Sequence, residues 1–344
     1  PVKAGQQGAA SEALPLVAYI HGGGFIGGNP KMNLHSKKAG FHRPVRALLD
    51  DGFAVASLGF GAESIGWGDV LRILAGQDSR IDPVAVQIVR DLRMPRVCLA
   101  ILVGAALAGA GMAMQALFQN PLADPYIVGV APGASVGATM ATALGVGSTL
   151  FGAHAVSIAA FAGSLIVSIL VYLLASRFGR VPVLHLLLFG VALGALCTGI
   201  TSLILMITPT EIHEVYFWLL GSFQGARWSE IVVIAPYLAL GVAALFYFAR
   251  EMDVILLGED EAQSLGIEVE RMKRLLLVAA TLLAAIAVAV SGIIAFVGLI
   301  VPHMMRLVVG PRHRVLLPAS LLCGGALMVV SDTLARSALS SIEM

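Results

Sequence analysis

The stretch Gly258-Glu-Asp-Glu-Ala-Gln-Ser-Leu-Gly266 is a short acidic segment set between two long runs without charged residues. The run before it, 231–249, contains no Asp, Glu, Lys or Arg. The run after it, 275–305, contains none either, and His303 is its one titratable side chain. A helix that is apolar on all sides is buried in a large core or lies in lipid. The pattern therefore predicts two membrane helices joined through a polar loop at the membrane surface.

The composition of the whole chain supports a membrane protein. Hydrophobic residues make up 58% and charged residues 12% of the 344 residues, and the mean hydropathy is +0.88. A typical soluble domain is about 25% charged. The formal net charge of +1 leaves no basic surface for nucleic acid. The three cysteines have no metal-ligand spacing, so the sequence predicts no metal site.

The first 61 residues differ from the rest. A strand-like run (16–20) leads into His21-Gly-Gly-Gly-Phe25, and a second strand-like run follows at 53–57. Residues 14–60 resemble the start of an α/β-hydrolase, where such a glycine turn forms an oxyanion hole. A nucleophile is also needed there, and Ser135 in Gly133-Ala-Ser-Val-Gly137 lies inside an uncharged run instead of at a strand-to-helix turn. We interpret 1–61 as a hydrolase-like fragment, not an independent domain, and 62–344 as the main domain.

Uncharged runs long enough to span a bilayer recur after residue 96, since a span needs about 20 apolar residues. We expect an all-α, multi-pass protein with about eight membrane helices. The sequence places one in each of 97–118, 183–207, 231–249 and 315–330, two in 125–176, and a full helix plus a short re-entrant one in 275–305.

Basic residues collect on one side of these spans, in the loops that include 177–180, 271–274 and 312–314. Positively charged loops mark the cytoplasmic side. The acidic segment 258–266 is then cytoplasmic, and Arg93, Arg96 and Arg336 face the outside.

Several motifs occur in an order that resembles one family, the FecCD-type membrane permeases of ABC importers for ferric siderophores, haem and cobalamin. The resemblance covers about residues 65–340. The matching strings are Arg93-Met-Pro-Arg96, Gly104-Ala-Ala-Leu-Ala-Gly109, Gln115, Asn120-Pro-Leu-Ala-Asp-Pro125, Trp218-Leu-Leu-Gly-Ser222, the 257–266 loop, Ser291-Gly-Ile-Ile-Ala-Phe-Val-Gly-Leu-Ile-Val-Pro-His303, Arg306 and Ser331-Asp-Thr-Leu-Ala-Arg336.

The resemblance implies ten helices in each subunit, a homodimer in the bacterial inner membrane, two ATPase subunits and an extracytoplasmic substrate-binding protein. Measured against that pattern, we expect this chain to lack the family's first and last helices. It implies no catalytic site and no bound cofactor, because ATP is hydrolysed by the partner. The cytoplasmic segment would be a helical knob that docks into an ATPase, formed by Gly258, Glu259, Asp260, Glu261, Ala262, Ser264, Leu265 and Gly266.

The remaining candidate residues lie at the two membrane faces and at a helix break. The resemblance makes Arg93, Arg96 and Arg336 the salt-bridge partners of the binding protein, and the alternative is anchoring to lipid headgroups. Prolines in 120–125 interrupt a helix, so Asn120, Pro121, Asp124 and Pro125 form either part of the pathway or a purely structural kink. Pro302, His303 and Arg306 end the re-entrant helix, where capping or ATPase contact is expected.

The sequence thus favours the permease subunit of an ATP-driven importer for a metal chelate. Two alternatives stay open: a fusion that inserts into the membrane without transporting, and a membrane-tethered esterase remnant. Ferric siderophore, haem and cobalamin are not distinguished by the sequence.

Overall fold

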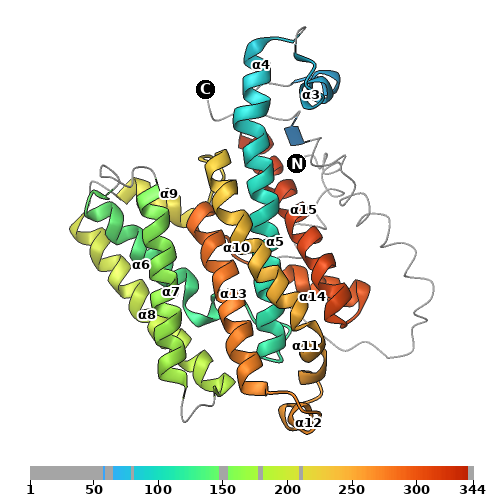
Figure 1. Ribbon diagram of the computed structural model, residues 1–344. Coiled ribbons are helices and arrows are strands. Elements are labelled where there is room, and N and C mark those ends of the chain that lie inside the picture. Colours follow the sequence, from blue (N-terminus) through green and yellow to red (C-terminus); the bar gives the residue numbers. More distant parts are fainter. Residues whose placement is uncertain are drawn as a thin grey trace, which may run out of the picture. The chain divides into compact units, whose positions relative to one another are not determined.

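The structure, a computed structural model, describes residues 57–58, 65–78, 81–146, 154–176, 181–208 and 212–339. All of the regular structure in these ranges is helical (Figure 1). Six helices are long and apolar enough to cross a membrane. They are α5 (Met94–Leu117), α7 (Ala155–Ala175), α8 (Val183–Ile207), α10 (Trp228–Tyr247), α13 (Val269–Ser291) and α15 (His313–Leu339). The predicted hydrolase-like fragment lies outside the described residues, apart from 57–58.

In the described ranges, six spans are fewer than the roughly eight membrane helices that the sequence predicts, and shorter helices connect them. Two of the shorter helices, α6 (Val130–Ala143) and α14 (Val297–Val309), occupy the places expected for the first helix of 125–176 and for the re-entrant helix. The others are α3 (Trp67–Leu74), α4 (Pro83–Gln87), the π-helical turn η3 (Ile88–Arg93), the 3₁₀ turn η4 (Pro125–Val128), α9 (Ile212–Leu220), α11 (Ala249–Ile255) and α12 (Glu259–Ser264).

Helix α5 is the centre of the bundle, and nearly every residue from Leu99 to Leu117 is buried. It packs against α10, α13, α14 and α15 (Figure 1). The contact with α15 is close because two glycines face each other. A Cβ atom added to Gly104 would lie 2.2 Å from the carbonyl oxygen of Gly324, so only glycine fits there. Small residues at helix contacts are typical of membrane bundles.

Ser135 lies in the interior of α6 and not at a strand-to-helix turn. Its Oγ donates a hydrogen bond to the Ala131 carbonyl 3.0 Å away, one turn back in the same helix. The glycines on either side of it pack α6 against α7. The Gly-x-Ser-x-Gly pattern here serves helix packing, in agreement with the interpretation from the sequence.

The outer helices expose apolar side chains. In the most hydrophobic stretches of α8 and α10, 17% of the residues are buried. Leu184, Val191 and Leu203 of α8 are 73%, 62% and 64% exposed. An apolar surface of this extent marks contact with lipid or another protein. The chain is a multi-span membrane protein.

Candidate functional site

The acidic segment 258–266 forms the helix α12, a small projecting knob between α11 and α13. Gly258 and Gly266 flank it with φ angles of +127° and +85°, values that side chains with a Cβ rarely adopt. The chain therefore makes a tight turn at each of the two glycines. Ala262 is fully buried and fixes the inner face of the knob, whereas Asp260 and Glu261 are exposed. The knob presents negative charge and faces away from the bundle.

A buried lysine ties the knob to α13. Lys273 is 3% exposed, and its Nζ donates to the Glu259 carboxylate at 2.5 Å. The same Nζ lies 3.5 Å from Glu270, whose other oxygen accepts a hydrogen bond from the Val181 N–H at 2.8 Å. Glu259 thus differs from its acidic neighbours, because its charge is used within the chain. These bonds join α12 to α13 and to the segment before α8.

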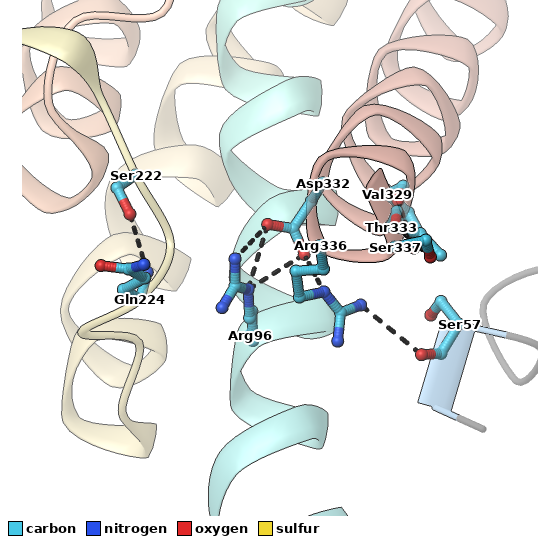
Figure 2. Close-up of polar contacts among 9 residues, drawn as sticks. All are labelled: Ser57, Arg96, Ser222, Gln224, Val329, Asp332, Thr333, Arg336 and Ser337. Atoms are coloured by element: carbon cyan, nitrogen blue, oxygen red, sulfur yellow. Dashed lines mark hydrogen bonds and ion pairs between the residues drawn. The ribbon is translucent and has the colours of Figure 1, made fainter. Parts of the chain in front are cut away.

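Three arginines gather at the far end of α13 from the knob, and the structure shows that they are not open cations. Arg93 is 7% exposed, and its Nη1 donates to the Leu58 carbonyl at 2.7 Å. Arg96 donates to the Asp332 carboxylate from Nε at 3.0 Å and from Nη2 at 2.7 Å (Figure 2). Arg336 approaches the second oxygen of that carboxylate with Nε at 3.1 Å. One carboxylate therefore holds two guanidinium groups and joins α5 to α15.

A cavity of about 760 Å³ opens beside these arginines. Its wall includes Arg93, Arg96, Asp332 and Arg336 on one side and the loop 220–226 on another. Ser222 in that loop donates its N–H to the Ser291 carbonyl at the end of α13. Because α13 has 23 residues, the cavity and the knob are about 35 Å apart along the helix. That length matches the roughly 30 Å hydrocarbon core of a bilayer.

The predicted break lies between α5 and α6, and its polar side chains bond backbone groups that the interruption leaves free. Asn120 Oδ1 accepts a hydrogen bond from the Leu122 N–H at 2.9 Å, and Asp124 Oδ1 accepts one from the Tyr126 N–H at 2.8 Å. The Tyr126 hydroxyl donates to the Ile294 carbonyl at 2.9 Å. Burial raises the pKa of the Asp124 carboxyl, and the Tyr126 hydrogen bond opposes that rise. Pro121 is exposed and Pro125 is buried, so the break has one open and one packed side.

Pro302 and His303 lie in the middle of α14 and Arg306 lies in its last turn, so the helix continues to Val309 beyond the residues that were expected to end it. Pro302 is buried and His303 is half-buried. Within the part of the chain that the structure describes, His303 Nδ1 and the Nε and Nη2 atoms of Arg306 are buried without a hydrogen-bond partner. The described ranges also contain no group of three His, Cys, Asp or Glu side chains placed to hold a metal ion.

Two residues that organise the site, Asp332 and Lys273, were not singled out from the sequence. Asp332 and Arg336 have the i, i+4 spacing of a helical ion pair, a signal that points to their contact. The spacing gives no sign of the third partner, Arg96, which comes from α5. Lys273 belongs to a basic cluster at the start of α13 that indicates sidedness but not burial.

Known proteins match almost the whole described part. The sequence model of the FecCD transport family matches residues 52–344. This match begins before residue 62, where we placed the start of the main domain. A cobalamin import permease of Halobacterium salinarum is 47% identical over 257 residues, 75% of this chain and 69% of that one. The hemin transport permease of Yersinia pestis is 40% identical, over 74% and 76%.

A solved structure of a metal-chelate type ABC transporter in an inward-facing conformation aligns with a TM-score of 0.75 and 30% identity. The alignment covers 89% of this chain and 96% of that one. The helical order, the apolar spans and these matches agree with one another. The chain belongs to the FecCD transport family of ABC importer permeases.

Proposed function

We propose that this chain forms the membrane pathway of an ATP-driven importer for a metal chelate, with cobalamin as the first candidate substrate. The 47% identical relative is a cobalamin import permease, and further relatives are named for hemin and for iron-hydroxamate import. A 35% identical relative is named for molybdate import, which makes an oxyanion a second substrate class for the test. The cytoplasmic membrane is the location that fits this role.

The observation that carries the proposal is the pair of polar ends on one apolar bundle. The acidic knob lies at one end of α13, and the arginine-lined cavity lies at the other end. Apolar helices of membrane length separate them. A permease needs this arrangement, because an energy source acts on one face while substrate is delivered to the other.

On the cytoplasmic side, the knob formed by 258–266 is proposed to dock into an ABC ATPase. Asp260, Glu261 and Leu265 are exposed there, and Leu265 is 67% exposed. Glu259 and Lys273 would transmit the movement of the ATPase to α13 as a rigid-body shift. The ATPase would bind and hydrolyse ATP, and this chain would bind no cofactor of its own.

On the outer side, the arginines are proposed to receive acidic residues of a substrate-binding protein. Asp332 already fixes the Nε edges of Arg96 and Arg336. A partner carboxylate would then approach the remaining guanidinium edge of Arg96, and Arg93 would add positive potential from behind. Charges placed in this way steer encounter and set register more than they add affinity. Anchoring to lipid headgroups is the alternative role of these arginines. Reconstitution into neutral vesicles without the binding protein tests whether the arginines need anionic headgroups.

The translocation pathway is proposed to lie along the two-fold axis of a homodimer, with α8 as a lining helix. This helix exposes small residues, among them Ala192, Gly199 and Ser202, along a surface that the monomer leaves uncovered. The break at Asn120, Pro121, Asp124 and Pro125 would contribute its open side to the inner part of the pathway. Pro302, His303 and Arg306 would contact the ATPase from the end of α14.

The test is uptake by proteoliposomes that contain this chain, its ATPase and its binding protein. The lumen is scored for radiolabelled cobalamin, haem, a ferric hydroxamate and molybdate, with ATP or with a non-hydrolysable analogue outside. We expect ATP-dependent accumulation of one chelate, with cobalamin preferred. If a stably inserted complex accumulates none of the four, the chain is better described by the non-transporting alternative.

A further inference from the structure

A groove between α7 and α13 shares no lining residue with the arginine-lined cavity. It measures about 410 Å³. Leu165, Ile169, Leu277 and Val278 supply its apolar lining, and Tyr172 and Arg274 complete it at one end. The neighbouring side chains are exposed and apolar, including Leu173 at 58% and Leu275 at 40%. The groove therefore opens onto the lipid-facing surface.

The charged and phenolic groups of the groove lie at one end of it, where a lipid headgroup would lie. Arg274 and Tyr172 lie near the ends of α13 and α7 on the side where the knob projects. The Nε of Arg274 donates to the Glu270 carbonyl one turn back, which turns the guanidinium toward the beginning of α13. A long basic side chain that reaches toward the membrane surface is positioned for a headgroup phosphate.

Two buried hydroxyl residues, Ser168 and Thr281, line the deeper part of the groove, and of their two hydroxyls only that of Ser168 is buried without a partner in the described residues. Ser168 is 5% exposed, and its Oγ has no hydrogen-bond partner in the described part of the chain. A buried donor without an acceptor costs free energy. Ser168 lies one turn of α7, about 6 Å, further from the helix end than Tyr172. In a phospholipid, the ester carbonyls follow the phosphate toward the acyl chain and offer such an acceptor.

From this sequence of groups we propose that the α7–α13 groove is a specific site for an anionic phospholipid of the cytoplasmic leaflet. Arg274 pairs with the phosphate, Ser168 donates to an ester carbonyl, and an acyl chain fills the apolar remainder. The occupant is chosen by charge, since a basic group between membrane helices on the cytoplasmic side favours acidic headgroups. The proposal does not depend on which chelate the permease carries.

The test is native mass spectrometry of the full chain in detergent, titrated with phosphatidylglycerol or with phosphatidylcholine of the same acyl composition. We expect phosphatidylglycerol to bind more tightly, and we expect Arg274→Gln to weaken it about fivefold while weakening phosphatidylcholine less, because the choline cation of that lipid already offsets the phosphate charge. Arg271→Gln is the matched control, because Arg271 is exposed on the same helix and does not line the groove. Its effect should stay below twofold.

A second pair of variants tests the acyl site. Val278→Trp, at the exposed edge of the groove, should lower binding of both lipids, and Leu275→Trp, outside the groove, should not. Equal losses for Arg274→Gln and Arg271→Gln would show diffuse charge attraction and overturn the proposal. The proposal would also be overturned if the chain bound neither lipid and formed a dimer that Val278→Trp dissociates. That result would assign the groove to a second copy of the chain.

Discussion

Removal of Asp332 should destabilise the protein more than removal of any exposed carboxylate. Asp332 is 7% exposed at its side chain, and it neutralises Arg96 and Arg336, which are 20% and 15% exposed. Breaking a fully buried ion pair by deleting one partner costs about 3–5 kcal/mol. Because both arginines keep some solvent contact beside the cavity, we expect about 2–3 kcal/mol for Asp332→Ala. For a chain of this size that corresponds to a fall in Tm of about 5 °C.

The assay is thermal unfolding in detergent, followed by tryptophan fluorescence. Asp69→Ala is the control, since the Asp69–Arg72 pair is 45% and 60% exposed and should contribute less than about 1 kcal/mol. Asp332→Asn keeps the shape and loses the charge, so it should reproduce most of the effect. The double variant Asp332→Ala/Arg336→Gln should recover part of it, because one uncompensated cation is gone. A Tm for Asp332→Ala equal to that of Asp69→Ala would refute the reasoning.

Three further predictions concern the knob, the central helix and the break. Lys273→Met should release Glu259 and raise amide hydrogen exchange across 258–266 by about tenfold, as expected from the loss of a charged hydrogen bond; unchanged exchange would show that the bridge does not hold α12. Gly104→Ala should prevent stable folding, because its Cβ would overlap a carbonyl of α15, whereas Gly199→Ala, with nothing within 4 Å, should be neutral or stabilising in a Tm measurement. Tyr126→Phe should cost about 1 kcal/mol by removing one hydrogen bond, and a cost near zero by fluorescence-monitored unfolding would mean that the hydroxyl is solvated instead.

The helical order of the bundle was accessible from the sequence because length and hydropathy determine membrane spans. The uncharged runs place α5, α8 and α10 to within a few residues, whereas α13 begins at Val269, before its uncharged run starts at residue 275. The short helix α14 was also foreseen, since Ser291, Gly292 and Pro302 interrupt a run that is too long for one span. The elements that were missed, such as α9 and α11, have nine and seven residues, which is too short for a membrane span.

The chemistry of the two ends was accessible only in part. The turns at Gly258 and Gly266 follow from residue type, and the structure has them. The ion pairing of the arginines does not follow from residue type, because it depends on contacts between residues far apart in the chain. Arg96 and Asp332 are separated by 236 positions, and no local pattern brings them together. From the sequence alone, a basic residue next to a membrane span is therefore interpreted as an unpaired charge, because its partner is not visible in the local pattern.

Coupling of transport to ATP hydrolysis depends most directly on the knob as the ATPase contact. The decisive measurement is co-purification of the ATPase with the chain in detergent, comparing wild type with Asp260→Lys/Glu261→Lys. Glu259 is left unchanged, because its bond to Lys273 belongs to the fold. Asp69→Lys, an exposed charge reversal at the other end of the molecule, is the control. The account predicts that the knob variant keeps its Tm and loses the ATPase, while the control retains it. Retention of the ATPase by the knob variant would contradict it.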